Sequence, residues 1–96
     1  MIETFGNPLT EDLFDDRRTR AARTFPPELR RLGRQKLLYL HVAVELKDLR
    51  MPPGNRQGAL RGDPKGYHSI RINDQWRVVF RWESGNAFDV QIADYH

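Results

Sequence analysis

The sequence predicts an α+β fold: an N-terminal strand and two helices, followed by a twisted antiparallel sheet that packs against the helices. The main observation is that apolar or aromatic residues occupy every second position in the last third of the chain, namely His68, Ile70, Ile72, Trp76, Val78, Phe80, Trp82, Phe88, Val90 and Ile92. A period of two is typical of half-buried strands, and turn-forming residues interrupt it at 73–75 and 83–86. Leucines at helical spacing over residues 26–46 predict the helical layer that covers this sheet.

The composition limits the classes of protein to consider. A chain of 96 residues is long enough for one domain, spanning 1–96, with one modest core. Its formal net charge of +3 is consistent with a polyanionic partner. The absence of cysteine excludes disulfides, thiol catalysis and cysteine-based zinc sites, and the histidines lack metal-ligand spacing, so we expect no metal or other cofactor. Without a signal peptide or a membrane-length apolar run, we expect a cytoplasmic protein.

The N-terminal third predicts a short strand and a short helix. Residues 1–5 are the strand candidate, and the helix opens near residue 10 with Leu9, Leu13 and Phe14 on its buried side. Four arginines then fall within residues 17–23. Such a charge run is typical of a solvated helix end or a mobile linker, and the alternative is a contact for RNA or for a partner protein.

The main helix is expected to begin at Pro26, because proline is tolerated in the first helical turn. It should end within residues 47–50, before the Pro-Pro-Gly at 52–54. Its apolar stripe consists of Leu29, Leu32, Leu37, Leu40 and Val44, widened by Leu38, Val42 and Leu46. A short strand near residues 59–61 is expected to lead into the sheet.

The register of the sheet follows from the alternation, because a shift of one residue would send both tryptophans to solvent. The pattern pairs Ile72 with Trp76, Ile70 with Val78, Arg71 with Arg77 and Ser69 with Val79; in the second hairpin it pairs Trp82 with Phe88, Arg81 with Asp89 and Arg77 with Ala93. Both tryptophans should therefore pack on the main helix.

The pairing of Arg71 with Arg77 predicts an anion site on the polar face of the sheet. Like charges directly opposite each other destabilise a sheet, and guanidinium forks suit phosphate in particular. The alternative is that both guanidinium groups are simply solvated. Arg81 opposite Asp89, in contrast, reads as an ordinary cross-strand ion pair.

Several short motifs together resemble one known family. They are LRGD at 60–63, GYHSIRIN at 66–73, QWR at 75–77 and DYH at 94–96, and they resemble the HigB branch of the RelE/ParE toxin superfamily. RMPPGNR at 50–56 is similar to the loop of GraT-like members of that branch. The resemblance covers essentially the whole chain and implies a RelE-like fold.

This resemblance implies the toxin of a type II toxin–antitoxin pair. Such a toxin would enter the ribosomal A site and cleave mRNA there without a metal ion, which inhibits translation. Its partner would be a HigA-like antitoxin with a helix-turn-helix domain. The toxin would be monomeric within a hetero-oligomeric complex that binds operator DNA.

The resemblance also implies roles for individual residues. By position, Asp94, Tyr95 and His96 match the terminal catalytic residues of the family, and Arg77 matches its phosphate-binding arginine. His96 is expected to be the general acid or base nearest the scissile phosphate, and Tyr95 to stack on or orient the nucleotide.

Arg61 occupies the place of a catalytic lysine, which is a departure from the family. Because arginine stays charged, Arg61 can stabilise an anion but is not suited to act as a base. Arg71, Arg81 and Lys65 are further candidates for binding RNA phosphates. Gly58 stands where some relatives carry a histidine.

Two other functions remain open at this stage. A toxin like the ParE branch would inhibit gyrase without any chemistry of its own, and the terminal DYH motif argues against it. A basic RNA-binding module without catalysis is the other alternative, and the replacement of the catalytic lysine favours it.

Overall fold

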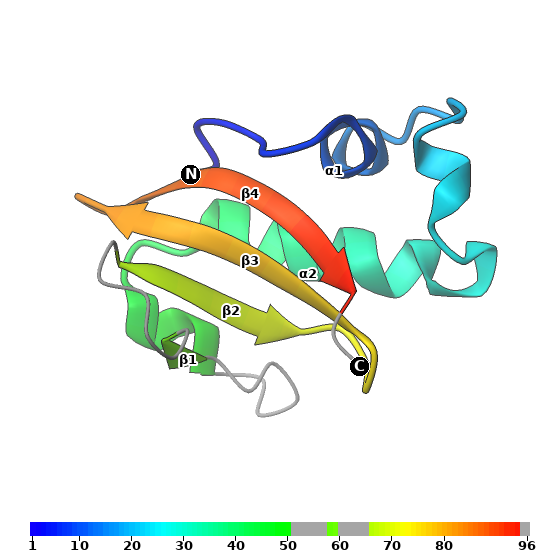
Figure 1. The fold of residues 1–96 in the computed structure, drawn as a ribbon. Coiled ribbons are helices and arrows are strands. Elements are labelled where there is room, and N and C mark those ends of the chain that lie inside the picture. Colours follow the sequence, from blue (N-terminus) through cyan, green and yellow to red (C-terminus); the bar gives the residue numbers. More distant parts are fainter. Residues whose placement is uncertain (51–57, 60–65, 95–96) are drawn as a thin grey trace.

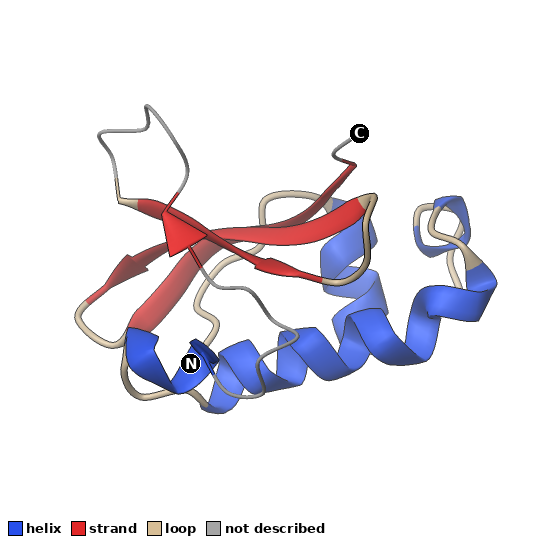
Figure 2. Ribbon diagram, turned by 90° about the horizontal axis from the view of Figure 1, so that it is seen from below, coloured by secondary structure: helices blue, strands red, loops and turns tan. Residues whose placement is uncertain are grey.

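The computed structural model describes residues 1–50, 58–59 and 66–94 and has the expected α+β fold (Figure 1). In chain order, its elements are α1 (Pro8–Phe14), η1 (Ala22–Thr24), η2 (Pro27–Leu29), α2 (Arg30–Val42), η3 (Leu46–Arg50), β1 (Gly58–Ala59), β2 (Tyr67–Arg71), β3 (Trp76–Glu83) and β4 (Asn86–Asp94). The four strands form one antiparallel sheet in the order β1-β2-β3-β4. Helix α2 runs across one face of the sheet (Figure 2), and α1 lies beside β4. None of the helices in the described ranges is long and apolar enough to cross a membrane.

The N-terminal segment runs parallel to β4 but is not a continuous strand. Isolated bridges join Ile2 to Ala87 and Phe5 to Val90. The backbone N–H of Glu3 donates to the carbonyl of Ala87 at 2.8 Å. The segment therefore extends the sheet beyond β4 without completing a fifth regular strand.

A buried threonine fixes α1 to the sheet. The backbone N–H and the hydroxyl of Thr10 both donate to Asn7 Oδ1, at 3.0 and 2.6 Å, so that Asn7 caps the helix. The same hydroxyl accepts the backbone N–H of Ile92 in β4 at 2.8 Å. Thr10 is fully buried, and these bonds satisfy its hydroxyl.

Helix α2 is shorter than the sequence predicted. The chain leaves the helix at Ala43, which has an extended backbone, and η3 forms a separate turn. The Asp48 carboxylate accepts the backbone N–H groups of Val44 and Glu45, both at 3.0 Å, and these bonds lower the pKa of Asp48. A continuous helix to residue 50 would lose this cap.

The predicted apolar stripe of the main helix was too wide. Leu37 and Leu40 are fully buried, as expected. Leu38, Val42 and Val44 are instead 40%, 69% and 72% exposed, so the prediction that they face the sheet was wrong. Only one side of α2 contacts the sheet, because each helix buries the residues on one face.

The core lies between α2 and the sheet. Its largest fully buried side chains are Phe25, Phe80, Leu13, Leu37, Leu40, Leu49, Ile70, Val78 and Val90. Trp76 and Trp82 are half-buried and pack against this core, Trp76 edge-on to Phe25 with 5.1 Å between ring centroids. Both indoles thus point to the side that the alternation predicted.

The predicted register holds for the first hairpin and for half of the second. Arg71 lies opposite Arg77, which in turn lies opposite Ala93. Beyond Val79 the pairing shifts by one residue, so that Arg81 faces Phe88 instead of Asp89. The predicted cross-strand register, with Arg81 opposite Asp89 and Trp82 opposite Phe88, was therefore wrong; Trp82 faces Ala87.

A bulge at Asp89 causes this shift. Asp89 has a φ of 54°, which is rare for a residue other than glycine, and it adds one residue to β4. As a result Ala87 takes the core position and is fully buried. Phe88 lies on the opposite face instead, against the guanidinium of Arg81, so its predicted place in the core was wrong.

Candidate functional site

The face of the sheet opposite α2 carries the arginines that the sequence singled out. Alternation along β2 and β3 places Ser69, Arg71, Arg77 and Arg81 on this face. Among the described residues no helix covers it (Figure 2). The candidate site is therefore built on the regular strands of the sheet, which hold side chains in fixed positions.

Arg71 and Arg77 form the cross-strand pair at the centre of this site. Arg71 also makes an ion pair with the exposed Asp74 in the following turn. Burial, together with the nearby positive charge of Arg71, lowers the pKa of Lys36 on α2. Lys36 is only 7% exposed and adds a third positive charge near this end of the sheet.

A buried hydroxyl orients Arg77. The Nε atom of Arg77 donates to Ser69 Oγ at 2.9 Å, and Ser69 is 4% exposed. Because the Nε–H of Arg77 donates to Ser69, an anion bound by Arg77 would contact the two terminal nitrogens of the guanidinium. Sequence reasoning missed Ser69, although its position in register with Val79, next to the Arg71–Arg77 pair, placed it on the same face.

Arg81 has a different environment, with acidic and aromatic neighbours. Its guanidinium contacts Glu83 at 2.5 Å and Asp89 at 3.7 Å, and it lies 4.9 Å from the centroid of the Phe88 ring. The hydroxyl of Tyr67 also donates to Asp89 at 3.2 Å. The expected ion pair with Asp89 thus forms despite the bulge, and two carboxylates compensate the charge of Arg81.

Asp94 ends β4 and lies opposite Trp76. Its carboxylate accepts the side-chain amide of Gln75 at 3.1 Å. Asp94 is paired with Trp76, and the next pair along the strands is Arg77 with Ala93. Because successive pairs face opposite sides of a sheet, the side chains of Asp94 and Arg77 belong to opposite sides. The other predicted site residues, Arg61, Lys65, Tyr95 and His96, lie outside the described residues.

This fold, with arginines on the regular strands of an uncovered sheet face, defines a small α+β protein suited to binding phosphate groups. Comparison with known proteins makes the assignment more specific. Residues 3–96 match the family model described as the RelE-like toxin of the type II toxin–antitoxin system HigB. The chain belongs to this family, as its motifs indicated, and its partner is therefore an antitoxin.

Individual relatives agree with the family match. Toxin HigB-1 of Vibrio cholerae is 40% identical over 92 residues, which cover 96% of this chain and 95% of the relative. Endoribonuclease HigB of Proteus vulgaris is 40% identical over 65 residues, or 64% of this chain and 65% of the relative. An uncharacterised protein of Haemophilus influenzae is 29% identical over 62 residues, or 65% of this chain and 61% of the relative.

Proposed function

We propose that this toxin is a ribosome-dependent endoribonuclease that cleaves mRNA without a metal ion and thereby inhibits translation. Its family membership and its similarity to a protein named Endoribonuclease HigB support the endonuclease activity. The observation that carries the proposal is the Arg71–Arg77 cross-strand pair, with Arg77 held by buried Ser69. Two adjacent arginines on a rigid sheet favour a bound phosphate over mutual repulsion.

The chemistry requires three events at one phosphate. The 2′-hydroxyl loses its proton and attacks phosphorus, negative charge grows on the pentavalent phosphate, and the 5′-oxygen takes a proton as it leaves. We assign the charge stabilisation to Arg77 and Arg71. Arg61 adds positive charge only, because a guanidinium does not give up its proton at neutral pH.

Proton transfer is assigned to the carboxyl-terminal residues. Asp94 supplies a carboxylate that can accept a proton, and His96 supplies an imidazole that exchanges protons near neutral pH. Because Asp94 and Arg77 belong to opposite sides of the sheet, we propose that the chain end bends around the end of the sheet to bring these groups to the phosphate. Tyr95 orients the nucleotide by stacking. Lys65 and Arg81 bind neighbouring phosphates, with Arg81 contributing least because Glu83 and Asp89 compensate its charge.

We also propose the partners that this activity requires. The antitoxin is of the HigA type, with a helix-turn-helix domain, and the complex of toxin and antitoxin binds operator DNA. The substrate is mRNA in the ribosomal A site, so the protein acts in the cytoplasm. The family match supports these assignments through the toxin–antitoxin class.

The nature of the products tests the proposal. Purified toxin is incubated with a 5′-labelled mRNA, either free or on translating ribosomes, in the same Mg²⁺-containing buffer. We expect cleavage only on ribosomes, leaving a 2′,3′-cyclic phosphate and a 5′-hydroxyl, and no cleavage when the nucleotide at the cut carries a 2′-deoxy sugar. Cleavage of the 2′-deoxy mRNA would exclude attack by the 2′-hydroxyl.

The same assay separates the alternatives. A non-catalytic RNA-binding module, which the arginine at position 61 favours, would bind programmed ribosomes and leave the mRNA intact. A gyrase inhibitor would leave both the mRNA and translation unaffected in a purified system that contains no DNA.

A further inference from the structure

The basic character of this protein is concentrated in one segment away from the sheet. Residues 17–34 contain seven arginines and a single acidic residue, Glu28, and so carry a net charge of +6. The whole chain has a net charge of +3, so the remaining residues are net negative. The arginines on the sheet face are too few to explain the basic pI.

Acidic neighbours compensate two of these arginines. Arg17 pairs with Asp12 at 3.5 Å and with Asp15 at 3.3 Å, and Arg30 pairs with Asp16 at 3.1 Å. Within the part of the chain that the structure describes, no ion pair is made by Arg18, Arg20, Arg23, Arg31 or Arg34. Arg34 donates through Nε to the carbonyl of Phe14.

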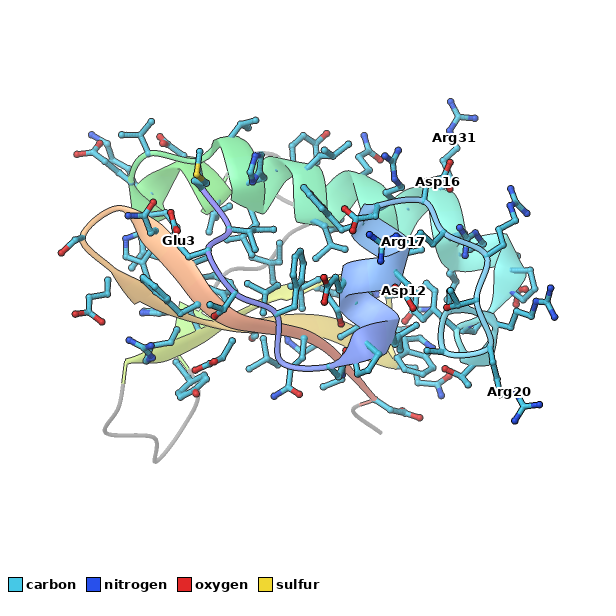
Figure 3. The ribbon with its side chains drawn as sticks, turned by 90° about the horizontal axis from the view of Figure 1, so that it is seen from above. Glu3, Asp12, Asp16, Arg17, Arg20 and Arg31 are labelled. Carbon is cyan, nitrogen blue, oxygen red and sulfur yellow. The ribbon has the colours of Figure 1, made fainter. Side chains whose placement is uncertain are left out.

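The arginines converge on two adjoining hollows, one of about 230 Å³ and one of about 250 Å³. The first is lined by Asp16, Arg18, Arg30, Arg31 and Arg34, and the second by Arg18, Ala22, Arg23, Phe25, Pro27 and Arg30. Arg18 and Arg30 line both, so the hollows form one continuous arginine surface, defined here as Arg18, Arg23, Arg30, Arg31 and Arg34. In Figure 3, Arg31 and Arg20 extend from opposite sides of this end of the molecule, and Arg20 lines neither hollow.

This surface lies at the same end of the molecule as the candidate site. Figure 1 places the start of α2 near the end of β4 and the turn between β2 and β3. The ring of Phe25, which lines the second hollow, contacts Trp76, and Trp76 is the cross-strand partner of Asp94. These contacts place the arginine surface on the helix side of the sheet, so it is separate from the face that carries Arg71 and Arg77.

We propose that the arginine surface is a second binding site for the phosphate backbone of RNA, separate from the sheet face and resting on the proposed action on mRNA. Arginine forks bind phosphate in a bidentate manner, and a row of them neutralises successive phosphates. The second hollow combines arginines with Ala22, Phe25 and Pro27, but charged residues alone line the first. The four arginines of the first hollow therefore fit a polyanion better than the apolar anchor of a protein interface. The RNA is either the mRNA beyond the cleavage site or ribosomal RNA, which offer the same chemistry.

Two variants with equal net charge test this site. The surface variant carries Arg18→Gln, Arg23→Gln and Arg31→Gln, three exposed positions without ion pairs among the described residues. The control variant carries Arg17→Gln, Arg20→Gln and Lys47→Gln, which are also exposed but line neither hollow. Binding is measured to a short 2′-O-methylated RNA, which cannot be cleaved, and to ribosomes that carry the same RNA.

We expect the surface variant to bind RNA roughly tenfold or more weakly than the control at about 0.1 M salt. The slope of log Kd against log salt should fall by about 2, because each lost contact to single-stranded RNA contributes about 0.7. If the surface variant binds both the free RNA and the ribosomes more weakly, the arginine surface binds mRNA. If it binds only the ribosomes more weakly, the arginine surface binds ribosomal RNA. Either result supports the proposal.

Equal RNA binding by the surface and control variants overturns the proposal. If the surface variant then binds the antitoxin more weakly than the control does, the surface is a site for an acidic protein segment. Cleavage of mRNA by the wild-type toxin is measured in parallel. If the wild-type toxin cleaves mRNA and the two variants bind RNA equally well, the second binding site is refuted and the proposed enzyme is not. If the wild-type toxin binds RNA but does not cleave it, the proposed enzyme is refuted and the second binding site is not.

Discussion

Arg77 and Arg81 lie on the same face of the sheet but contact different partners. Arg77 donates to the neutral hydroxyl of Ser69, whereas Arg81 is held by two carboxylates and an aromatic ring. A guanidinium whose charge is already compensated attracts a phosphate less strongly. Because Arg77 lies opposite Arg71, whereas Arg81 has two acidic neighbours, we expect Arg77 to serve function and Arg81 to serve stability.

Substituting each arginine by alanine tests this separation. Arg77→Ala should abolish most mRNA cleavage, because it removes half of the Arg71–Arg77 pair. It should change the free energy of unfolding little, because relief of the repulsion from Arg71 offsets the lost hydrogen bond to Ser69. Arg81→Ala should retain more cleavage and lose more stability. Urea denaturation and the ribosome cleavage assay measure the two effects, and the opposite ranking would show that Arg77 is a structural residue.

Ser69 should act on cleavage through Arg77. Ser69→Ala removes the acceptor of the Arg77 Nε–H, so the guanidinium loses its fixed orientation, and we expect cleavage to slow about tenfold. Ser69→Thr retains a hydroxyl and should restore much of the rate. If both variants are equally slow at an unchanged melting temperature, the hydroxyl does not position Arg77.

The parity of the strands was enough to predict the Arg71–Arg77 pair, but not the groups that orient the site. The sequence does not mark Ser69 or Gln75 as part of a site, because a serine in a strand and a glutamine in a turn are both common. Lys36 is buried although lysine is rarely buried in proteins. The assignments of Tyr95 and His96 remain predictions.

At the scale of the elements, the bulge in β4 decides which residues reach the core. Period two continues through Phe88, Val90 and Ile92, so the sequence contains no interruption that marks Asp89. Two hydrogen bonds hold Asp89 at its positive φ. Its backbone N–H donates to Thr4 Oγ1 at 2.8 Å, and its carboxylate accepts from the hydroxyl of Tyr67. Contacts distant in sequence thus override the local pattern.

Two neighbouring substitutions distinguish the bulged from the regular register. Ala87→Leu should destabilise the protein by about 1–3 kcal/mol, because it forces extra volume into a closely packed core. Phe88→Ala should cost clearly less than the roughly 3–5 kcal/mol expected for a core aromatic. Urea titrations give both values, and a larger loss for Phe88→Ala would indicate that Phe88 is a core residue and that the bulge is absent.

The end of α2 was not predictable for a related reason. Ala43 and Val44 are apolar and continue the helical spacing, but the helix ends at Val42 and Asp48 accepts the backbone N–H groups of Val44 and Glu45. The start of the helix, after two prolines, followed local chemistry and was predicted to within a few residues.

At the scale of the whole molecule, protonation of His68 should make folding sensitive to mild acid. Burial lowers the pKa of His68, so near its ordinary value of 6.5 the unfolded chain binds more protons than the folded one. Stability is therefore expected to fall as the pH drops through about 6.5. His68→Phe retains an aromatic ring against Phe80 and should show a smaller decrease in melting temperature between about pH 7.5 and pH 5.5. An equal decrease in both proteins would assign the acid sensitivity to other groups.

The distribution of charge also describes the whole molecule. A net negative remainder and a strongly basic segment at 17–34 create an asymmetric field, which orients the protein toward a polyanion before contact. In Figure 1 the start of α2 lies toward the same end of the molecule as the turn between β2 and β3, although Figure 2 shows α2 on the opposite face of the sheet from the arginine pair. The second site thus serves capture of the RNA, and the sheet site its cleavage.

Deletion of His96 alone tests the central claim, that the chain ends in the catalytic centre of an mRNA endonuclease. The shortened and full-length toxins are compared in cleavage of mRNA on translating ribosomes, with melting temperature and antitoxin affinity measured on the same preparations. We predict that the deletion abolishes cleavage, because it removes a proton-transfer group. The other two quantities should be unchanged, because terminal residues seldom contribute to stability. Cleavage by the shortened toxin at the rate of the full chain would contradict the account and move the chemistry to Arg61, Arg71 and Arg77.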